Sequence, residues 1–441
     1  MFNRLIQTYL VNIYNVKKIQ LFLLLLFTAL CVFLTLNKHS RSGIFNYTSE
    51  IYTDKAGYYV YLPALFIYDF EADKLPDSIV LKTGNGFELD TKNTNTIRTK
   101  YSCGVAILQA PFFLINHGIA KLFNLDQSGF SISYHKAIDI ASVFYLVLGL
   151  VFLYHFLNKH VSSRATYITL FSFFLGTNLF FYSIDDTGMS HIYSFFLFSV
   201  YLFLADTIFQ KTHHFTNYLL FGLITGLIIV VRPMNIIFLP VFFIVQKNYN
   251  SGFFKSLYNT PFRYYILCFI TICITLLPQL LYWKYVSGSF FHYSYTKEGF
   301  TNLLSPKLIL FWFSTNNGLF IYSPLFLFSL LGLYIIRKEK KIFAILTFLY
   351  FIGISYLFAS WWCWHYGCGY GSRTFVEYYA LFSLPFAYLV DKWWSDKVLR
   401  AVLFTSIGLL ILLNLKLSYS VDNCWYGGDW DWHEYFTLLK K

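Results

Sequence analysis

Three features of the sequence predict an all-α polytopic membrane protein. The 441 residues are 57% hydrophobic and only 13% charged, with a mean hydropathy of +0.52, a composition that excludes an ordinary soluble domain. Apolar segments long enough to cross a bilayer recur along the chain. The basic residues, which give a net charge of +12, fall between these segments as in cytoplasmic loops, so the charge does not indicate nucleic-acid binding.

The first predicted span covers residues 18–37 and follows a pair of lysines. It is long enough to cross about 30 Å of hydrocarbon, and it lacks a small-residue cleavage site. We therefore expect a retained helix rather than a signal peptide, with the N-terminus in the cytoplasm.

A large outer loop, residues 38–134, is predicted to follow this span. Within 57–70, apolar residues recur at three- and four-residue steps, a pattern that predicts an amphipathic helix on the membrane surface. Such a helix would hold Asp54 at the boundary between water and lipid. The segment 101–123 is also apolar, but Pro111 and polar residues interrupt it, so we place it on the surface as a second interfacial helix.

The positions of later basic residues support this placement. If 101–123 crossed the membrane, Lys159 and Arg164 would lie outside, whereas basic residues gather in cytoplasmic loops. The run from Arg337 to Lys341 is the firmest anchor of the inner side, since short basic loops resist translocation.

The remaining spans follow at intervals along the chain, which makes about eleven membrane helices in a single transmembrane domain, residues 1–441. They are predicted at 135–157, 165–182, 191–210, 216–232, 234–246, 263–283, 319–336, 342–360, 374–391 and 398–417. This topology places the loop 361–373 and the C-terminal tail 418–441 outside.

Four cysteines fall on the predicted outer side, where one or two disulfides can form in an oxidising compartment. They are Cys103, Cys363, Cys368 and Cys424. A metal site from Cys363, His365 and Cys368 is the alternative, but this spacing matches no zinc pattern, so a disulfide or no bond is favoured.

Aspartates mark two of the four polar outer segments. The first is Asp54-Lys55, where the aspartate is either a functional carboxylate or the cap of a following helix. The second runs from Ser183 to His191 and contains Asp185 and Asp186, which either bind a metal or a sugar or terminate two helices.

The other two segments carry arginines. Arg232 and the loop 284–318, which includes His292, form the third, and this arginine either reaches lipid headgroups or grips a phosphate. The fourth is the aromatic loop 361–373, whose three spaced glycines allow unusual backbone dihedrals and close approach beside Arg373. This loop suits a phosphate or a sugar ring.

In this order the polar segments resemble the GT-C superfamily of integral-membrane glycosyltransferases, which use sugars carried on a polyprenyl or dolichyl phosphate. The stretches that carry the resemblance are Asp54 with Tyr58 to Pro63, Tyr182 to His191, Gly318 to Pro324, and Trp361 to Arg373 leading into Pro385. Bacterial members commonly have a basic residue ahead of the Gly-Leu-Phe stretch, where this chain has Asn316-Asn317.

The resemblance implies an inverting sugar transfer with Asp54 as the catalytic base and Asp186, or else Asp185, as a second acid. On the same reading Arg373, Arg232 and Lys55 would bind the donor phosphate. The expected substrate-binding residues are Asp185, His191, Tyr58, His292, His365 and Tyr366. No metal is required, although Asp54, Asp186 and His191 offer ligands for a divalent ion.

The expected partners are a polyprenyl-phosphate sugar, membrane lipids, and a lipid, glycan or protein acceptor, at an active site on the outer face of the bacterial inner membrane. A transporter or flippase for a lipid-linked or anionic substrate is the competing class, and its marks would be ionisable residues deep in the membrane or paired halves with broken helices. A non-enzymatic scaffold ranks third, because it gives no reason for outer loops to collect acids and arginines.

Overall fold

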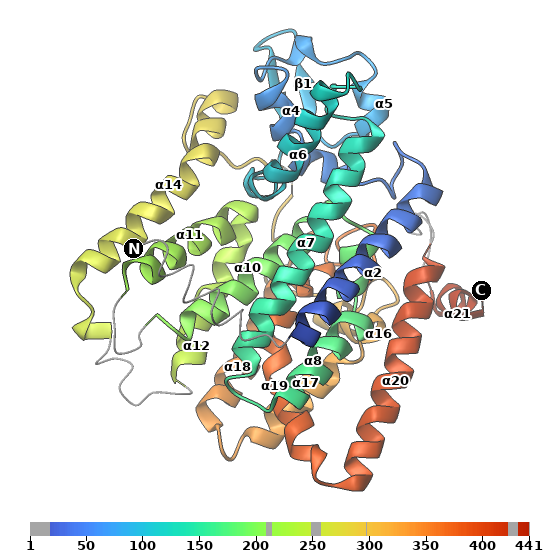
Figure 1. Cartoon of the computed structure of the whole chain (residues 1–441), viewed down its shortest axis with the longest axis vertical. Helices are drawn as coiled ribbons and strands as arrows, with labels where there is room; N and C mark the ends of the chain where they lie inside the picture. The colour runs from blue at the N-terminus through green and yellow to red at the C-terminus, as the bar shows by residue number, and fades with distance from the viewer. Residues whose placement is uncertain (1–17, 209–213, 248–256, 297, 422–430, 441) are drawn as a thin grey trace.

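The structure is a computed structural model that describes residues 18–208, 214–247, 257–296, 298–421 and 431–440, and most of these residues are helical (Figure 1). The elements of the first half are α2 (Lys18–Ser42), α3 (Asp54–Tyr59), α4 (Tyr61–Phe66), η1 (Ala72–Lys74), α5 (Ile79–Thr83), β1 (Glu88–Asp90), β2 (Thr96–Arg98), α6 (Gly104–Leu122), α7 (Ile132–Leu157), α8 (Ser163–Gly176), α9 (Leu179–Ile184) and α10 (Ser190–Ala205). Those of the second half are α11 (Phe215–Val231), η2 (Pro233–Phe238), α12 (Val241–Lys247), α14 (Phe262–Ser287), α15 (Leu308–Phe313), α16 (Leu319–Tyr322), α17 (Phe326–Ile336), α18 (Lys341–Ala359), η3 (Arg373–Phe375), α19 (Tyr379–Trp394), α20 (Lys397–Ser420) and α21 (Trp432–Lys440).

Among the described residues, six helices are long and apolar enough to cross a membrane: α2, α6, α7, α14, α18 and α20. Five of them correspond to predicted spans, and shorter apolar helices occupy the predicted spans at 191–210, 216–232, 234–246 and 319–336. Large apolar side chains on α2, α14 and α20 remain exposed, as expected for helices that face lipid. The chain is therefore a helical membrane protein.

Two predicted spans are each broken into two helices. In 319–336 the break falls at Ser323, whose backbone is non-helical because the following Pro324 disfavours the helical region for the residue before it. In 165–182 the break lies between α8 and α9 at Asn178, whose side-chain amide donates to the Tyr370 carbonyl at 3.0 Å and accepts from the Tyr379 hydroxyl at 2.6 Å. Both breaks place polar backbone beneath the aromatic outer loop.

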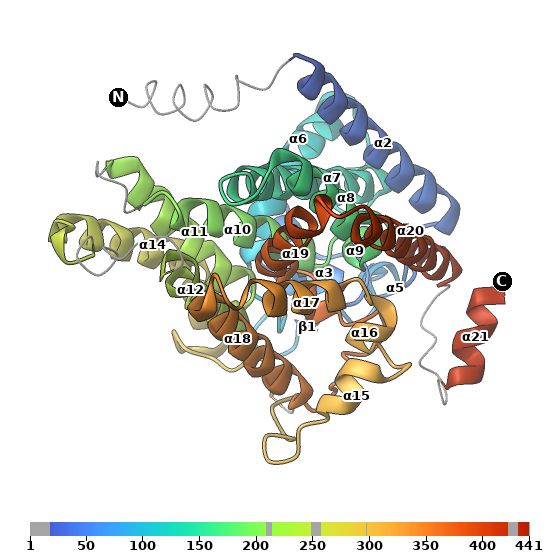
Figure 2. The same ribbon diagram turned by 90° about the horizontal axis from the view of Figure 1, so that it is seen from below.

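Helix α19 lies near the centre of the bundle, beside α8, α17 and α20 (Figure 2). Every residue from Tyr379 to Val390 is buried, as expected of a helix that is apolar all round. Helix α2 lies at the periphery: only 11% of the residues in its apolar 18-residue stretch are buried, whereas 61% are buried in the corresponding stretch of α7.

The predicted surface helix at 57–70 is wrong. The structure has two short helices, α3 and α4, and their residues Tyr58, Tyr59, Tyr61 and Leu62 are all buried. Pro63 explains the break, because it cannot donate to the carbonyl four residues earlier and its ring clashes there. The tyrosines are buried because their hydroxyls find partners; that of Tyr61, for example, donates to the Tyr101 carbonyl at 2.6 Å.

The helix predicted at 101–123 is confirmed, whereas its placement on the membrane surface stays a prediction. Helix α6 runs for 19 residues through Pro111, and it is long and apolar enough to be a membrane span. Its polar residues meet partners on α7: the Asn116 amide donates to the Ser133 hydroxyl at 3.2 Å, and His117 bonds the Tyr134 hydroxyl at 2.6 Å. Figure 1 shows α6 at the same end of the molecule as α4 and β1.

The loops that were predicted to share the inner side contact one another. Ser162, which follows α7, donates its backbone N–H to the Asp391 carboxylate at 2.9 Å. Glu339, from the basic run, pairs with Lys392. These contacts join the ends of α7, α17 and α19 at the end of the bundle opposite β1 (Figure 1).

Candidate functional site

A cavity of about 420 Å³ brings together all four polar segments found in the sequence. The predicted site residues that line it are Asp54, Lys55, Asp185, Asp186, Tyr366 and Arg373. The other segment contributes Glu298, from the loop after α14. Side chains up to 319 residues apart in the sequence thus face one volume of the size that ligand pockets have.

Asp54 enters the cavity from the first residue of α3. Thr53 before it has φ 47° and ψ −125°, a strained conformation for a β-branched residue, and such strain concentrates at functional sites. A β-carbon at Gly57 would lie 2.3 Å from the Tyr101 ring, so a glycine is needed for α3 to pack here. The cap interpretation of Asp54 is wrong, since Thr53 occupies the cap position and makes no side-chain cap hydrogen bond.

Arg373 is the partner of Asp54, with Nη2 3.4 Å from Oδ2. The Asp54 side chain keeps 37% of its surface exposed, on the cavity, whereas that of Arg373 keeps 18%. Burial would raise the pKa of the Asp54 carboxyl, but the charge of Arg373 and the Tyr101 hydroxyl hold this pKa below its usual range. Asp54 is therefore an ionised carboxylate that faces the cavity beside a guanidinium.

Lys55 and Asp186 form a tighter pair on another wall, with 2.7 Å between Nζ and Oδ1. The Lys55 ammonium is buried, at 3% exposure, and also donates to the Tyr47 carbonyl at 3.2 Å. Two of its three donors are thus satisfied within the protein. This pair links α3 to the turn after α9.

Asp185 lies deeper than its neighbour. Its Oδ2 accepts from the Ser418 hydroxyl at 2.9 Å, and its Oδ1 is buried without a hydrogen-bond partner. Burial raises the pKa of this carboxyl. The two adjacent acids therefore have different environments, one paired with a lysine and one poorly solvated.

Arg232 and His191 do not line the cavity. Both contact the buried carboxylate of Glu377, from Arg232 Nη1 at 2.9 Å and from His191 Nδ1 at 3.0 Å. Tyr58 is buried as well, with its ring 4.4 Å from that of Tyr101. These three predicted site residues support the cavity wall instead of facing its volume.

The glycines of the aromatic outer loop have the special roles that their spacing predicted. Gly367 and Gly371 adopt φ of +67° and +65°, and a β-carbon at Gly369 would lie 2.6 Å from the Tyr182 hydroxyl. At Gly371 the added carbon would meet the Tyr322 side chain at 2.7 Å. Close approach thus serves packing at Gly369 and Gly371, whereas Gly367 faces open space on the cavity.

The cysteine prediction is confirmed at one position, since Cys368 is disulfide-bonded. Cys103 and Cys363 are free, and Cys424 lies outside the described residues. The Cys363 sulfur is 3.6 Å from Nε2 of His365, which does not line the cavity. His292 is exposed and does not line it either.

The residues that were expected to offer metal ligands, Asp54, Asp186 and His191, do not form one group, because each has a different partner. In the part of the chain that the structure describes, the one group of histidines and acids close enough to share an ion is His39, Glu50 and Asp139.

Several residues of the cavity and its surroundings were not predicted as site residues. Lys100 lines the cavity and pairs with Glu298 at 2.6 Å, and Lys38 lines it from the end of α2. Glu377 organises Arg232 and His191, and its only signal in the sequence is an acid at the edge of an apolar segment.

The cavity combines an exposed carboxylate, a guanidinium and tryptophans at a boundary between helices and loops. Such a set can accept a proton, bind an anion and hold a sugar ring. No protein family, curated protein or solved structure matches this chain.

Proposed function

We propose that this protein is a membrane glycosyltransferase that moves a sugar from a polyprenyl-phosphate donor to an acceptor hydroxyl, with inversion at the anomeric carbon. The observation that carries the proposal is the placement of Asp54 and Arg373 on one cavity, 3.4 Å apart. A carboxylate supplies a base and a guanidinium supplies a phosphate-binding group, which are the two groups that this reaction needs.

The length of the Asp54–Arg373 contact supports a role for both residues in binding substrate. The other two ion pairs that border the cavity are 2.7 Å and 2.6 Å long. A 3.4 Å contact through one nitrogen leaves most of the guanidinium donors free, and a planar guanidinium can then bind two oxygens of a phosphate.

In the proposed reaction, Asp54 takes the proton from the acceptor hydroxyl while that oxygen attacks the anomeric carbon. The bond between this carbon and the phosphate oxygen breaks, and its electron pair leaves with the lipid phosphate. Arg373 stabilises the negative charge that gathers on the departing phosphate. Because attack and departure occur on opposite faces of the sugar, the ring must enter between Asp54 and Arg373 and separate them.

This separation would also activate the base. Arg373 holds the pKa of Asp54 low in the empty cavity, which makes the carboxylate a weak base. When the guanidinium turns to the donor phosphate, Asp54 loses this stabilisation and gains an anion nearby, so its pKa rises. Donor binding thus prepares Asp54 to accept the proton.

The remaining site residues take supporting roles in this proposal. Lys55 and Asp186 satisfy each other, so Asp54 is the stronger candidate for the base and Lys55 a weaker one for the phosphate. Tyr366 lines the cavity with Trp361 and Trp362, whose rings offer stacking faces for a sugar. Arg232 acts through Glu377 on the wall instead of on the phosphate.

The proposal places the cavity at the outer face of the inner membrane. A polyprenyl donor stays in the bilayer while its sugar phosphate reaches the interface, so the site must meet both lipid and water. Direct assay with different donors and acceptors would identify the sugar and show whether the acceptor is a lipid, a glycan or a protein.

Incubating the purified protein with a panel of polyprenyl-phosphate sugars and acceptors tests this function through the release of polyprenyl phosphate. Asp54→Asn should lower the transfer rate by about a hundredfold to ten-thousandfold, because an amide cannot accept the proton. Asp77→Asn changes an exposed acid of the same outer loop and should leave the rate unchanged.

Near wild-type transfer by folded Asp54→Asn would remove Asp54 as the base. Absence of polyprenyl phosphate release from every donor would contradict the function itself. Movement of intact donor across a vesicle bilayer without cleavage would instead support a flippase.

A further inference from the structure

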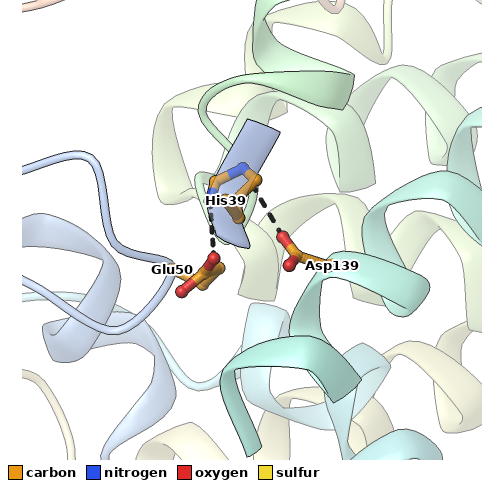
Figure 3. Close-up of side chains that lie close together, drawn as sticks. All are labelled: His39, Glu50 and Asp139. Carbon is orange, nitrogen blue, oxygen red and sulfur yellow. Dashed lines mark ion pairs between the residues drawn. The ribbon is translucent and has the colours of Figure 1, made fainter. Parts of the chain in front are cut away.

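Four buried ionisable side chains gather beside the cavity, and none of them lines it. His39 lies near the end of α2, Glu50 in the loop that follows, and His135 and Asp139 one turn apart on α7. Each residue is at most 7% exposed. Figure 3 shows the side chains of His39, Glu50 and Asp139 pointing toward one another from three separate segments.

The distances in this cluster fit a shared ion. One ligand atom from each of His39, Glu50 and Asp139 lies within 4.8 Å of the others. His39 Nδ1 is 2.5 Å from Glu50 Oε1, and His39 Nε2 is 3.6 Å from Asp139 Oδ1. The donor set is one imidazole and two carboxylates.

Neighbouring groups orient these three side chains as the partners of metal ligands do. In the tautomer in which His39 Nε2 donates to the Ile184 carbonyl at 3.1 Å, Nδ1, which faces Glu50 Oε1, is the ring nitrogen that can bind an ion. The Thr187 hydroxyl donates to Asp139 Oδ1 at 2.7 Å.

His135 Nδ1 lies 2.5 Å from Glu50 Oε2, so a proton on this nitrogen holds the carboxylate with its other oxygen toward His39. Ligating carboxylates are themselves commonly hydrogen-bonded in this way.

The cluster leaves polar atoms unsatisfied. Asp139 Oδ2 and His135 Nε2 are buried without a hydrogen-bond partner. Among the described residues, no lysine or arginine forms an ion pair with Glu50 or Asp139, and their charged partners are the two histidines. Two buried carboxylates cost free energy unless positive charge lies beside them, and a divalent ion would supply that charge.

We propose that His39, Glu50 and Asp139 bind a divalent transition-metal ion, with Zn²⁺ the best fit to one nitrogen and two carboxylate oxygens. Histidine nitrogen and Asp/Glu oxygen are both ordinary zinc ligands, and the imidazole favours a transition metal over Mg²⁺ or Ca²⁺. The site is separate from Asp54, and its existence does not depend on sugar transfer.

The ion would join the two acidic segments of the cavity. Glu50 lies four residues before Asp54, and Thr187, bonded to Asp139, directly follows Asp186. A β-carbon at Gly188 would lie 2.5 Å from the Glu50 carbonyl oxygen, so the turn with both acids packs on the Glu50 backbone. A metal here would fix the end of α2, the outer loop and α7 against one another.

The metal content of the full chain tests the proposal. The protein is exposed to Zn²⁺, purified in detergent and desalted, and its zinc is then measured by elemental mass spectrometry. We expect about one zinc ion per wild-type chain. Glu50→Gln and Asp139→Asn should each lose most of this zinc. Glu88→Gln changes an exposed acid of the same outer loop and should keep it.

A thermal measurement on the wild type covers the case in which these variants do not fold. A strong chelator should lower Tm, and Zn²⁺ should restore it where Mg²⁺ and Ca²⁺ do not. A wild-type chain that holds no zinc, with a Tm that neither chelator nor Zn²⁺ changes, would overturn the proposal and leave a cluster held by hydrogen bonds alone.

Discussion

The Asp54–Arg373 ion pair holds the Asp54 carboxylate in place through a long contact that a bound substrate could separate. At 3.4 Å it is longer than the other two ion pairs that border the cavity. A loose pair in a partly enclosed site still shifts the pKa of its carboxylate, but little is lost when a substrate separates the two charges. On the proposed function, the same guanidinium would hold the carboxylate before the donor binds and release it when the donor arrives.

If Arg373 moves from Asp54 to the donor phosphate when the donor binds, the pH dependence of transfer should show two different acid limbs. The carboxylate must be ionised to act, so activity falls as pH drops through its pKa. The acid limb of kcat/KM for the donor reports the free enzyme, where Arg373 holds the pKa of Asp54 low. The limb of kcat reports the donor complex and should lie at higher pH. Limbs that coincide would contradict the exchange.

Arg373→Lys is the matched variant for this measurement. It keeps the positive charge, so the order of the two limbs should persist, while the ammonium lacks the planar fork that binds two phosphate oxygens. Turnover should fall or the donor requirement rise. Kinetics that stay unchanged even in Arg373→Ala would remove the residue from the site.

The helices and turns show which patterns of the sequence were informative. Long apolar spans were predictable because burial in lipid demands an apolar stretch of fixed length, and α7 and α20 lie where they were expected. The structure of segment 57–70 was not predictable. Its apolar residues recur every three or four positions, and this period is the same for a helix that lies on lipid and for one that packs on protein. Tyrosine hydroxyls satisfied by distant carbonyls decided the outcome, and no local pattern reveals them.

Helix α3 offers a sharp test of this packing. In Gly57→Ala the new carbon would lie 2.3 Å from the Tyr101 ring and 2.4 Å from the Gly86 carbonyl, so α3 must shift. Overpacking of this kind typically costs about 1–3 kcal/mol, and we expect a lower Tm together with slower transfer because Asp54 begins the same helix.

Gly118→Ala is the control, because its added carbon meets nothing within 4 Å on the exposed side of α6. This change should leave Tm unchanged or raise it, since alanine favours a helix over glycine by about 1 kcal/mol. Equal Tm for the Gly57→Ala and wild-type chains would show that α3 is loosely packed.

The assembled molecule explains why the cavity was foreseen only in part. The sequence placed acids and arginines on one predicted side, and all four of these segments contribute to the cavity. It could not show that Lys100 would reach Glu298, or that Glu377 would draw Arg232 and His191 away from the cavity, because these contacts depend on how the helices pack. The histidines and acids beside the cavity were missed for the same reason.

The membrane topology gives the last prediction, because the side of the membrane on which the proposed reaction occurs depends on it. Lys92, between β1 and β2, and Lys338, between α17 and α18, are both exposed and lie in loops predicted to be outside and inside. In intact cells, a membrane-impermeant maleimide should label Lys92→Cys above the wild-type background and leave Lys338→Cys unlabelled until the membrane is opened. Both positions are exposed on the protein, so a difference in labelling between them would come from the bilayer that separates the reagent from one of them. Labelling of Lys338→Cys from outside would place the basic run on the outer side, and the cavity, at the opposite end of the helices, would then face the cytoplasm.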